Sequence, residues 1–214
     1  MPLSTHASVS AKAFETSSLA SACTTAATFA DALITSRQNI SPKRLIAPGP
    51  DVSQLERIFR SAASAPDHGL VRPWRFVVVP QNKRALLAEA FALALVDRDP
   101  GATLEQIETA REKAHRAPML MLVIARLGDC EPPIPALERM VSVGAAVQNM
   151  LLMAHGQGFG SSLTSGQAMQ SPRMRRLFAL EPGEEAVCFL NIGSVLKRKT
   201  QRLHPDASSF VKTL

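Results

Sequence analysis

Tyrosine is absent from this sequence of 214 residues, tryptophan occurs once, and aromatic residues make up only 5% of the chain. An aromatic-rich core is therefore excluded, and any core must be built mainly from Ala, Leu, Val and Met. Hydrophobic residues nevertheless account for 46% of the sequence. A chain of this length and composition can bury a sizeable core as one domain.

Cysteine is scarce as well. Cys23, Cys130 and Cys188 are odd in number and show neither CxxC nor Cys/His ligand spacing, which argues against a disulfide framework and a structural zinc site and favours a reducing compartment. No uninterrupted apolar run reaches the ~18 residues that a membrane span needs. The Ser-, Thr- and Ala-rich N-terminus has no signal-peptide pattern. We expect a cytoplasmic protein without membrane segments and with a poorly ordered leader over residues 1–27.

Several functional motifs are also missing. The chain has no GxSxG nucleophile elbow, no GxxxxGK[ST] phosphate loop and no GxGxxG after a strand, which argues against a hydrolase, a P-loop enzyme and a Rossmann fold. The net charge of +6 is scattered, except in the run KRKTQRLH (197–204). That run is open to two interpretations, a solvated tail or a nucleic-acid contact.

Hydrophobic periodicity and capping signals predict a series of helices with few strands. Asp51, with Gln54 three residues later, predicts a capping box at the start of one helix. The expected helices cover 28–37, 52–64, 82–96, 104–116, 136–158 and 171–180, and the expected strands cover 74–80, 118–126 and 185–194. This order predicts an α+β fold, with a small mixed sheet wrapped by helices in a single domain over residues 28–214.

Two segments carry candidate functional residues. In SAPDHGLVRPW (64–74), Asp67 and His68 could form an acid–base pair, or the segment could be a polar turn anchored by Trp74. GQGFGSSLTSG (156–166) is predicted to be a flexible loop that offers backbone N–H groups and the hydroxyls of Ser161, Ser162, Thr164 and Ser165. Such a loop suits a polar ring edge, a phosphate or a plain turn. His155 is expected to be a core or interface residue rather than a ligand.

The order of these segments resembles the FMN-dependent nitroreductase family, and most of all its compact NAD(P)H nitroreductases. The most specific piece is APDHGLVRPWRF (65–76), supported by GQGFGSSLTSG (156–166) and FLNIGS (189–194). The resemblance spans residues 28–214. It implies a nitroreductase-like α+β fold and an intertwined homodimer with FMN at the subunit interface.

The resemblance also implies a set of FMN contacts. The family's Arg-Arg-Ser tripeptide falls on Arg37, Gln38 and Asn39, and its turn contacts fall on Ser64 and His68. Its Trp-Arg-Ser segment falls on Leu163, Thr164 and Ser165, and basic residues after the last strand point to Lys197 or Arg198 for the phosphate. Gln38, Ser64, Leu163 and Thr164 depart from the family pattern, which implies weaker FMN binding or a different substrate.

The implied activity is that of an FMN-dependent NAD(P)H oxidoreductase, which reduces nitroaromatics, quinones or activated alkenes by ping-pong hydride transfer through FMN N5. The flavin carries the redox chemistry, so no catalytic residue and no metal are expected. Arg37 can hold a phosphate bidentately, and Gln38 and Asn39 suit a polar ring edge. The alternative is a flavin-binding or flavin-processing protein of the same fold with little reductase activity. A nucleic-acid-binding module based on the basic run is a third hypothesis.

Overall fold

The computed structural model describes residues 23–197, 200 and 203–214. Contacts divide the chain into two compact units, residues 1–37 and 38–214. The described part of the first unit is a helix over 23–36. The helix expected to begin at residue 28 therefore includes residues 23–27, which we had assigned to the leader. The rest of that leader, residues 1–22, lies outside the described residues.

The larger unit contains a sheet of five strands, β1 (Leu45–Ile46), β2 (Trp74–Val78), β3 (Met119–Arg126), β4 (Gly160–Thr164) and β5 (Glu184–Val195). The strand order is β1-β5-β3-β2, and β4 also pairs with β5. These strands pair antiparallel, while an isolated parallel bridge joins Asn39 to Ser161. The three strands expected from the sequence are confirmed. The strand β3 is buried over most of its length, as its apolar run predicted.

The prediction of a flexible loop over 156–166 was wrong, because β4 lies within this segment. Its backbone groups pair with β5 from Gly160 opposite Gly193 to Thr164 opposite Phe189. A side chain at Gly160 would collide with Val195 and crowd Ile40. The glycine therefore lets β4 approach its neighbours closely, and it is not a sign of flexibility.

Five further helices belong to the larger unit: α2 (Val52–Ala62), α3 (Arg84–Arg98), α4 (Leu104–Glu112), α5 (Ala136–Gly156) and α6 (Pro172–Leu177). The capping box of α2 is confirmed. Asp51 accepts a hydrogen bond from the Gln54 backbone at 2.8 Å, and the Gln54 side chain accepts one from the Asp51 backbone at 2.9 Å. Thr103 and Gln106 form a second capping box on α4. These caps fix where both helices begin.

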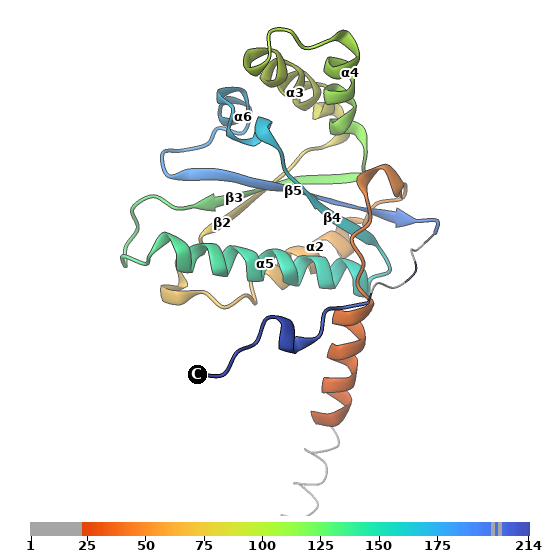
Figure 1. The fold of residues 1–214 in the computed structure, drawn as a ribbon, viewed down its shortest axis with the longest axis vertical. Helices are drawn as coiled ribbons and strands as arrows, with labels where there is room; N and C mark the ends of the chain where they lie inside the picture. The colour runs from red at the N-terminus through yellow and green to blue at the C-terminus, as the bar shows by residue number, and fades with distance from the viewer. Residues whose placement is uncertain (1–22, 198–199, 201–202) are drawn as a thin grey trace, which may run out of the picture. The chain divides into compact units, whose positions relative to one another are not determined.

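The helices cover the sheet on both faces, so that the larger unit has three layers (Figure 1). The helices α2 and α5 pack on one face, against alternate residues of β3 such as Met121 and Val123. The helices α3 and α6 pack on the other face, against Leu122 and Phe189. This alternation follows from the two-residue period of a strand. The expected α+β architecture, a sheet wrapped by helices, is confirmed.

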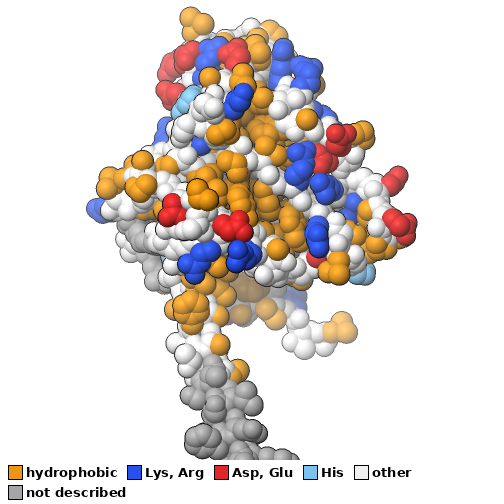
Figure 2. All heavy atoms as spheres, turned by 180° about the vertical axis from the view of Figure 1, so that it is seen from behind, with side chains coloured by type: hydrophobic (Ala, Val, Ile, Leu, Met, Phe, Trp, Pro, Cys, Tyr) orange, Lys and Arg blue, Asp and Glu red, His pale blue; other side chains and the backbone are white. Residues whose placement is uncertain are grey.

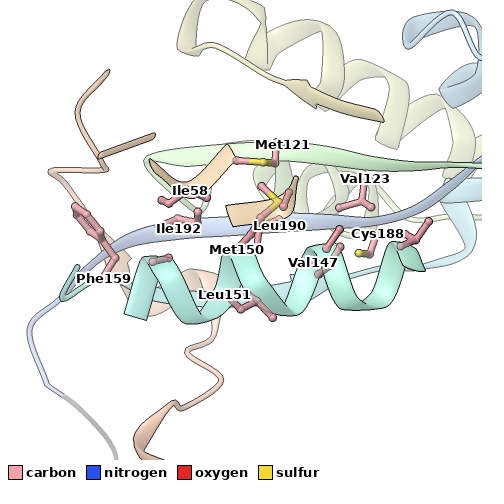
Figure 3. Packing of buried hydrophobic residues seen from close by; sticks show 14 of the residues in the cluster. Ile58, Met121, Val123, Val147, Met150, Leu151, Phe159, Cys188, Leu190 and Ile192 are labelled. Atoms are coloured by element: carbon pink, nitrogen blue, oxygen red, sulfur yellow. The ribbon is translucent and has the colours of Figure 1, made fainter. Parts of the chain in front are cut away.

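The long helix α5 is the main support of one sheet face, as its apolar girth predicted. Figure 3 shows Val147 and Met150 of α5 next to Leu190 and Ile192 of β5. Met150, Leu190 and Ile192 are fully buried. In the part of the chain that the structure describes, no helix is long and apolar enough to cross a membrane.

Candidate functional site

A cavity of about 750 Å³ opens on the sheet face that carries α3 and α4. Its volume lies within the 300–1,000 Å³ that is typical of ligand pockets. The walls are α3, α4 and the segment 164–169 that follows the end of β4, and the floor is formed by β3 and β5. The lining residues include Phe91, Leu95, Arg98, Gln106, Lys113, Arg116, Leu120, Thr164, Ser165, Phe189 and Asn191.

The floor of the cavity is largely apolar and rigid. Leu120 and Phe189 are buried in neighbouring strands. The Phe91 ring of α3 meets the Phe189 ring edge-to-face, with centroids 5.6 Å apart. Phe189 also meets Phe178 at 6.0 Å. Such a floor suits a flat aromatic ligand.

One face of α4, continued through the 3-10 turn Lys113–His115 to Arg116, supplies the polar wall. Gln106, Thr109, Lys113 and Arg116 recur at three- and four-residue spacing and line the cavity together. With Arg98, the lining contains three basic side chains and a single acidic one, Glu105. Sequence reasoning missed these residues, because the segment resembled a charged surface helix. The i, i+3 and i+7 spacing of Gln106, Thr109 and Lys113 was the available signal.

A buried arginine fixes the wall to the sheet. Arg84, at the start of α3, is 1% exposed and donates to the carbonyls of Val79 (2.8 Å), Ala114 (2.6 Å) and Pro118 (3.2 Å). Burial lowers the pKa of its guanidinium. These bonds join the end of β2 to the segment between α4 and β3, and so they hold the cavity wall in place.

Two of the residues predicted to contact a cofactor, Thr164 and Ser165, line the cavity. Leu163 does not, because it pairs with Leu190 in register and lies on the opposite face of the sheet. Ser161 and Ser162 are buried, so the expectation of four available hydroxyls is corrected. The Ser162 Oγ is sealed and has no hydrogen-bond partner within the described residues.

The predicted tripeptide is divided between the two units. Arg37 is the last residue of the first unit, and Gln38 begins the second. Asn39 forms the parallel bridge with Ser161, and the Ile40 backbone donates to the Ser161 carbonyl at 3.0 Å. Asn39 therefore lies beside the start of β4, the strand that leads to Thr164. Arg198 lies outside the described residues.

The turn before β2 forms a separate group. The Arg72 backbone N–H donates to Asp67 Oδ2 at 2.7 Å, which confirms Asp67 as a turn-forming residue. The His68 Nδ1 lies 2.7 Å from Glu138 Oε2 at the start of α5, and both side chains are exposed. Neither His68 nor Ser64 lines the cavity. The predicted site residues are therefore split between this turn and the cavity.

Comparison with known proteins agrees with this architecture. The model of the Nitroreductase family matches residues 45–194, which include the five strands except for Val195, the last residue of β5. The chain belongs to the nitroreductase family. This confirms the resemblance noted from the motif order.

Individual nitroreductases match along most of their length. A Haemophilus influenzae relative named "Putative NAD(P)H nitroreductase" is 33% identical over 183 residues, covering 85% of this chain and 97% of the relative. The crystal structure of a nitroreductase-like family protein from Bacillus cereus superposes with a TM-score of 0.74 at 18% identity, covering 86% and 94% of the two chains. An FMN-dependent nitroreductase from Clostridium difficile gives 0.56 at 16% identity, with coverage of 83% and 92%. These structures confirm the fold.

Proposed function

We propose that this protein is an FMN-dependent NAD(P)H oxidoreductase that reduces nitroaromatics, quinones or activated alkenes. The observation that carries the proposal is the cavity, which has an apolar floor and a basic polar wall and lies in a nitroreductase fold. The names of the relatives and structural neighbours, which mention NAD(P)H and FMN, support it.

The residues present fit the isoalloxazine ring of FMN. The ring is flat and apolar except along its pyrimidine edge, and the cavity pairs aromatic side chains with donors on one wall. Lys113 and Arg116 line the cavity and would offer positive charge to the N1–C2=O edge of a bound ring. Thr164 and Ser165 offer hydroxyl and backbone donors near the end of β4.

The remaining predicted contacts keep the roles that the resemblance implies. Arg37 would hold the phosphate, with Gln38 and Asn39 as further polar contacts, and Ser64 and His68 would reach the ring from the turn. When bound, FMN supplies the hydride chemistry for both substrates in turn. The protein residues bind, orient and stabilise charge, so a catalytic acid is not needed. Positive charge from Lys113 would favour the reduced flavin.

The two separate groups of site residues favour a homodimer with the FMN site shared between subunits. Residues of the turn could complete the cavity of a second copy, which they do not line in their own chain. Exposed apolar side chains on α5 also fit such an interface: Leu137 is 78% exposed and Val141 67%. The face seen from behind in Figure 2, which is not the α5 side, also has hydrophobic side chains gathered across its middle. Large exposed patches of this kind are rare on monomers.

The dimer is tested by placing a charge on α5. We expect Leu137→Asp to shift the protein from dimer to monomer in light scattering coupled to size-exclusion chromatography, and to weaken FMN binding. Leu104→Asp is the matched control, since Leu104 is 83% exposed on α4 and lies outside both the α5 face and the cavity lining. A Leu137→Asp protein that remains dimeric would contradict the proposed interface.

The activity is tested by anaerobic steady-state kinetics with NADH or NADPH and one acceptor from each class. We expect oxidation of the nucleotide that depends on the acceptor, with the parallel double-reciprocal lines of a ping-pong mechanism. If FMN binds but no acceptor is reduced faster than by free FMN, the alternative of a flavin-binding protein gains over the oxidoreductase.

A further inference from the structure

A polar residue lies on the otherwise apolar floor of the cavity. Asn191 sits in the middle of β5, is 2% exposed, and lines the cavity next to Phe189 and Leu120. Leu120 is its partner across the β3–β5 pair. Burying an amide in such surroundings is unfavourable unless both its donor and its acceptor have partners. The partners of Asn191 therefore indicate whether its role is structural.

The Asn191 amide nitrogen has several partners within the protein. It donates to Thr164 Oγ1 at 3.0 Å and lies 3.3 Å from both the Ser162 and the Phe189 carbonyl oxygens. The two carbonyls are obligate acceptors, so the orientation of the amide is set by its surroundings. The amide nitrogen of Asn191 therefore points toward β4, and its Oδ1 points away from β4.

The Asn191 Oδ1 accepts no hydrogen bond from any described residue. The neighbouring Ser162 Oγ is a fully buried polar atom without a hydrogen-bond partner in the described part of the chain, whereas Asn191 Oδ1 is not one of these atoms. Asn191 thus combines a fixed, buried side chain with one acceptor that remains available at the cavity floor. A structural role explains why the amide nitrogen is hydrogen-bonded within the protein, but it does not explain why Oδ1 is left without a partner among the described residues.

We propose that Asn191 Oδ1 accepts a hydrogen bond from the ring N–H of a planar imide, which in this family is N3–H at the pyrimidine edge of FMN. The inference rests on the proposed function. An imide edge presents an N–H between two carbonyl oxygens, and it requires one acceptor accompanied by donors. The cavity supplies that combination, with Asn191 as the acceptor and with Lys113, Arg116 and Ser165 as donors. Asn191 is thereby a further cofactor-binding residue, which sequence reasoning missed because it lies inside an apolar strand.

The test compares FMN with an analogue methylated at N3, which lacks the N–H. Dissociation constants are measured by the quenching of flavin fluorescence for the wild type and for Asn191→Ala. We expect wild type to bind the analogue at least about tenfold more weakly than FMN, since the buried acceptor loses its partner. In Asn191→Ala, FMN itself should bind about tenfold more weakly, and the discrimination against the analogue should shrink to about threefold or less.

A second readout separates hydrogen bonding from steric effects. With FMN labelled with nitrogen-15 at N3, the N3 proton should exchange slowly with solvent in wild type and distinctly faster in Asn191→Ala. Ser162→Ala is the matched control, because Ser162 is the register partner of Asn191 but its hydroxyl is sealed from the cavity. It should keep both the discrimination and the slow exchange.

The outcomes are distinguishable. If FMN binds and Asn191→Ala discriminates against the analogue as strongly as wild type, with unchanged exchange, the role of Asn191 is refuted while the proposed function stands. If wild type binds neither FMN nor the analogue, the proposed function itself fails. Circular dichroism and thermal unfolding of Asn191→Ala confirm that any loss of binding occurs in a folded protein.

Discussion

The ionisation of Glu184 should control the acid stability of the fold. Glu184 begins β5 and is only 5% exposed. Its carboxylate is paired with Arg75 through two contacts, one of them from Nε at 3.0 Å, and with Arg126 Nε at 3.4 Å. The backbone N–H of Glu181 donates to it at 3.2 Å. The Arg75 hydrogen bonds lower the pKa of Glu184 from 4.5 to about 2, against the opposing effect of burial.

The size and sign of the effect follow from this shift. One pKa unit corresponds to about 1.4 kcal/mol, so the ionised Glu184 contributes about 3 kcal/mol to the free energy of unfolding. Because the folded pKa is depressed, this contribution is present above the unfolded value of 4.5 and is lost as the pH falls toward about 2. Glu184→Gln should therefore be less stable than wild type at neutral pH, and the difference should close in acid.

Urea unfolding of wild type and Glu184→Gln, from neutral pH down to about pH 3, measures this directly. Glu56→Gln is the control, because Glu56 forms an exposed ion pair with Arg60, which should contribute little to stability. If the free energies of wild type and Glu184→Gln fall in parallel with decreasing pH, the assignment of acid sensitivity to Glu184 is refuted.

Three further experiments test the positive charge of the cavity wall, the close packing of β4 and the burial of Cys188. Lys113→Met should raise the dissociation constant for FMN about tenfold and make the potential of the bound flavin more negative, as measured by potentiometry, because a positive charge on the cavity wall is lost. Lys83→Met, outside the cavity, should do neither. Gly160→Ala should destabilise the fold by about 1–3 kcal/mol in urea unfolding, since its Cβ would collide with Val195. Burial raises the pKa of the Cys188 thiol to about 11, so at mildly alkaline pH a thiol reagent should modify it only after unfolding; rapid modification of the native protein would contradict its buried position.

The elements that sequence reasoning predicted correctly are those with a local signal. The run at β3 is apolar without interruption, α5 is apolar around most of its girth, and Asp51 with Gln54 marks the start of α2. In each case the pattern is complete within one segment and agrees with the packing that the fold requires.

The elements that were missed depend on contacts between distant segments. The strand β4 has the composition of a loop and becomes a strand through its pairing with β5. His68 meets Glu138, which lies 70 positions away in the sequence. Lys113 belongs to the cavity only because Arg84 holds the α4 wall against the sheet. The family motifs pointed to Thr164 and Ser165, which line the cavity, while tertiary structure was needed to place Lys113 and Asn191 in the same lining.

The visible spectrum of the purified protein, recorded anaerobically before and after the addition of NADPH or NADH, tests whether the protein binds FMN and reduces it with a nicotinamide nucleotide. We expect the absorption bands of bound oxidised flavin, present on purification or after incubation with FMN, and their bleaching by at least one of the two nucleotides. A protein that stays colourless after incubation with FMN would contradict the proposed function.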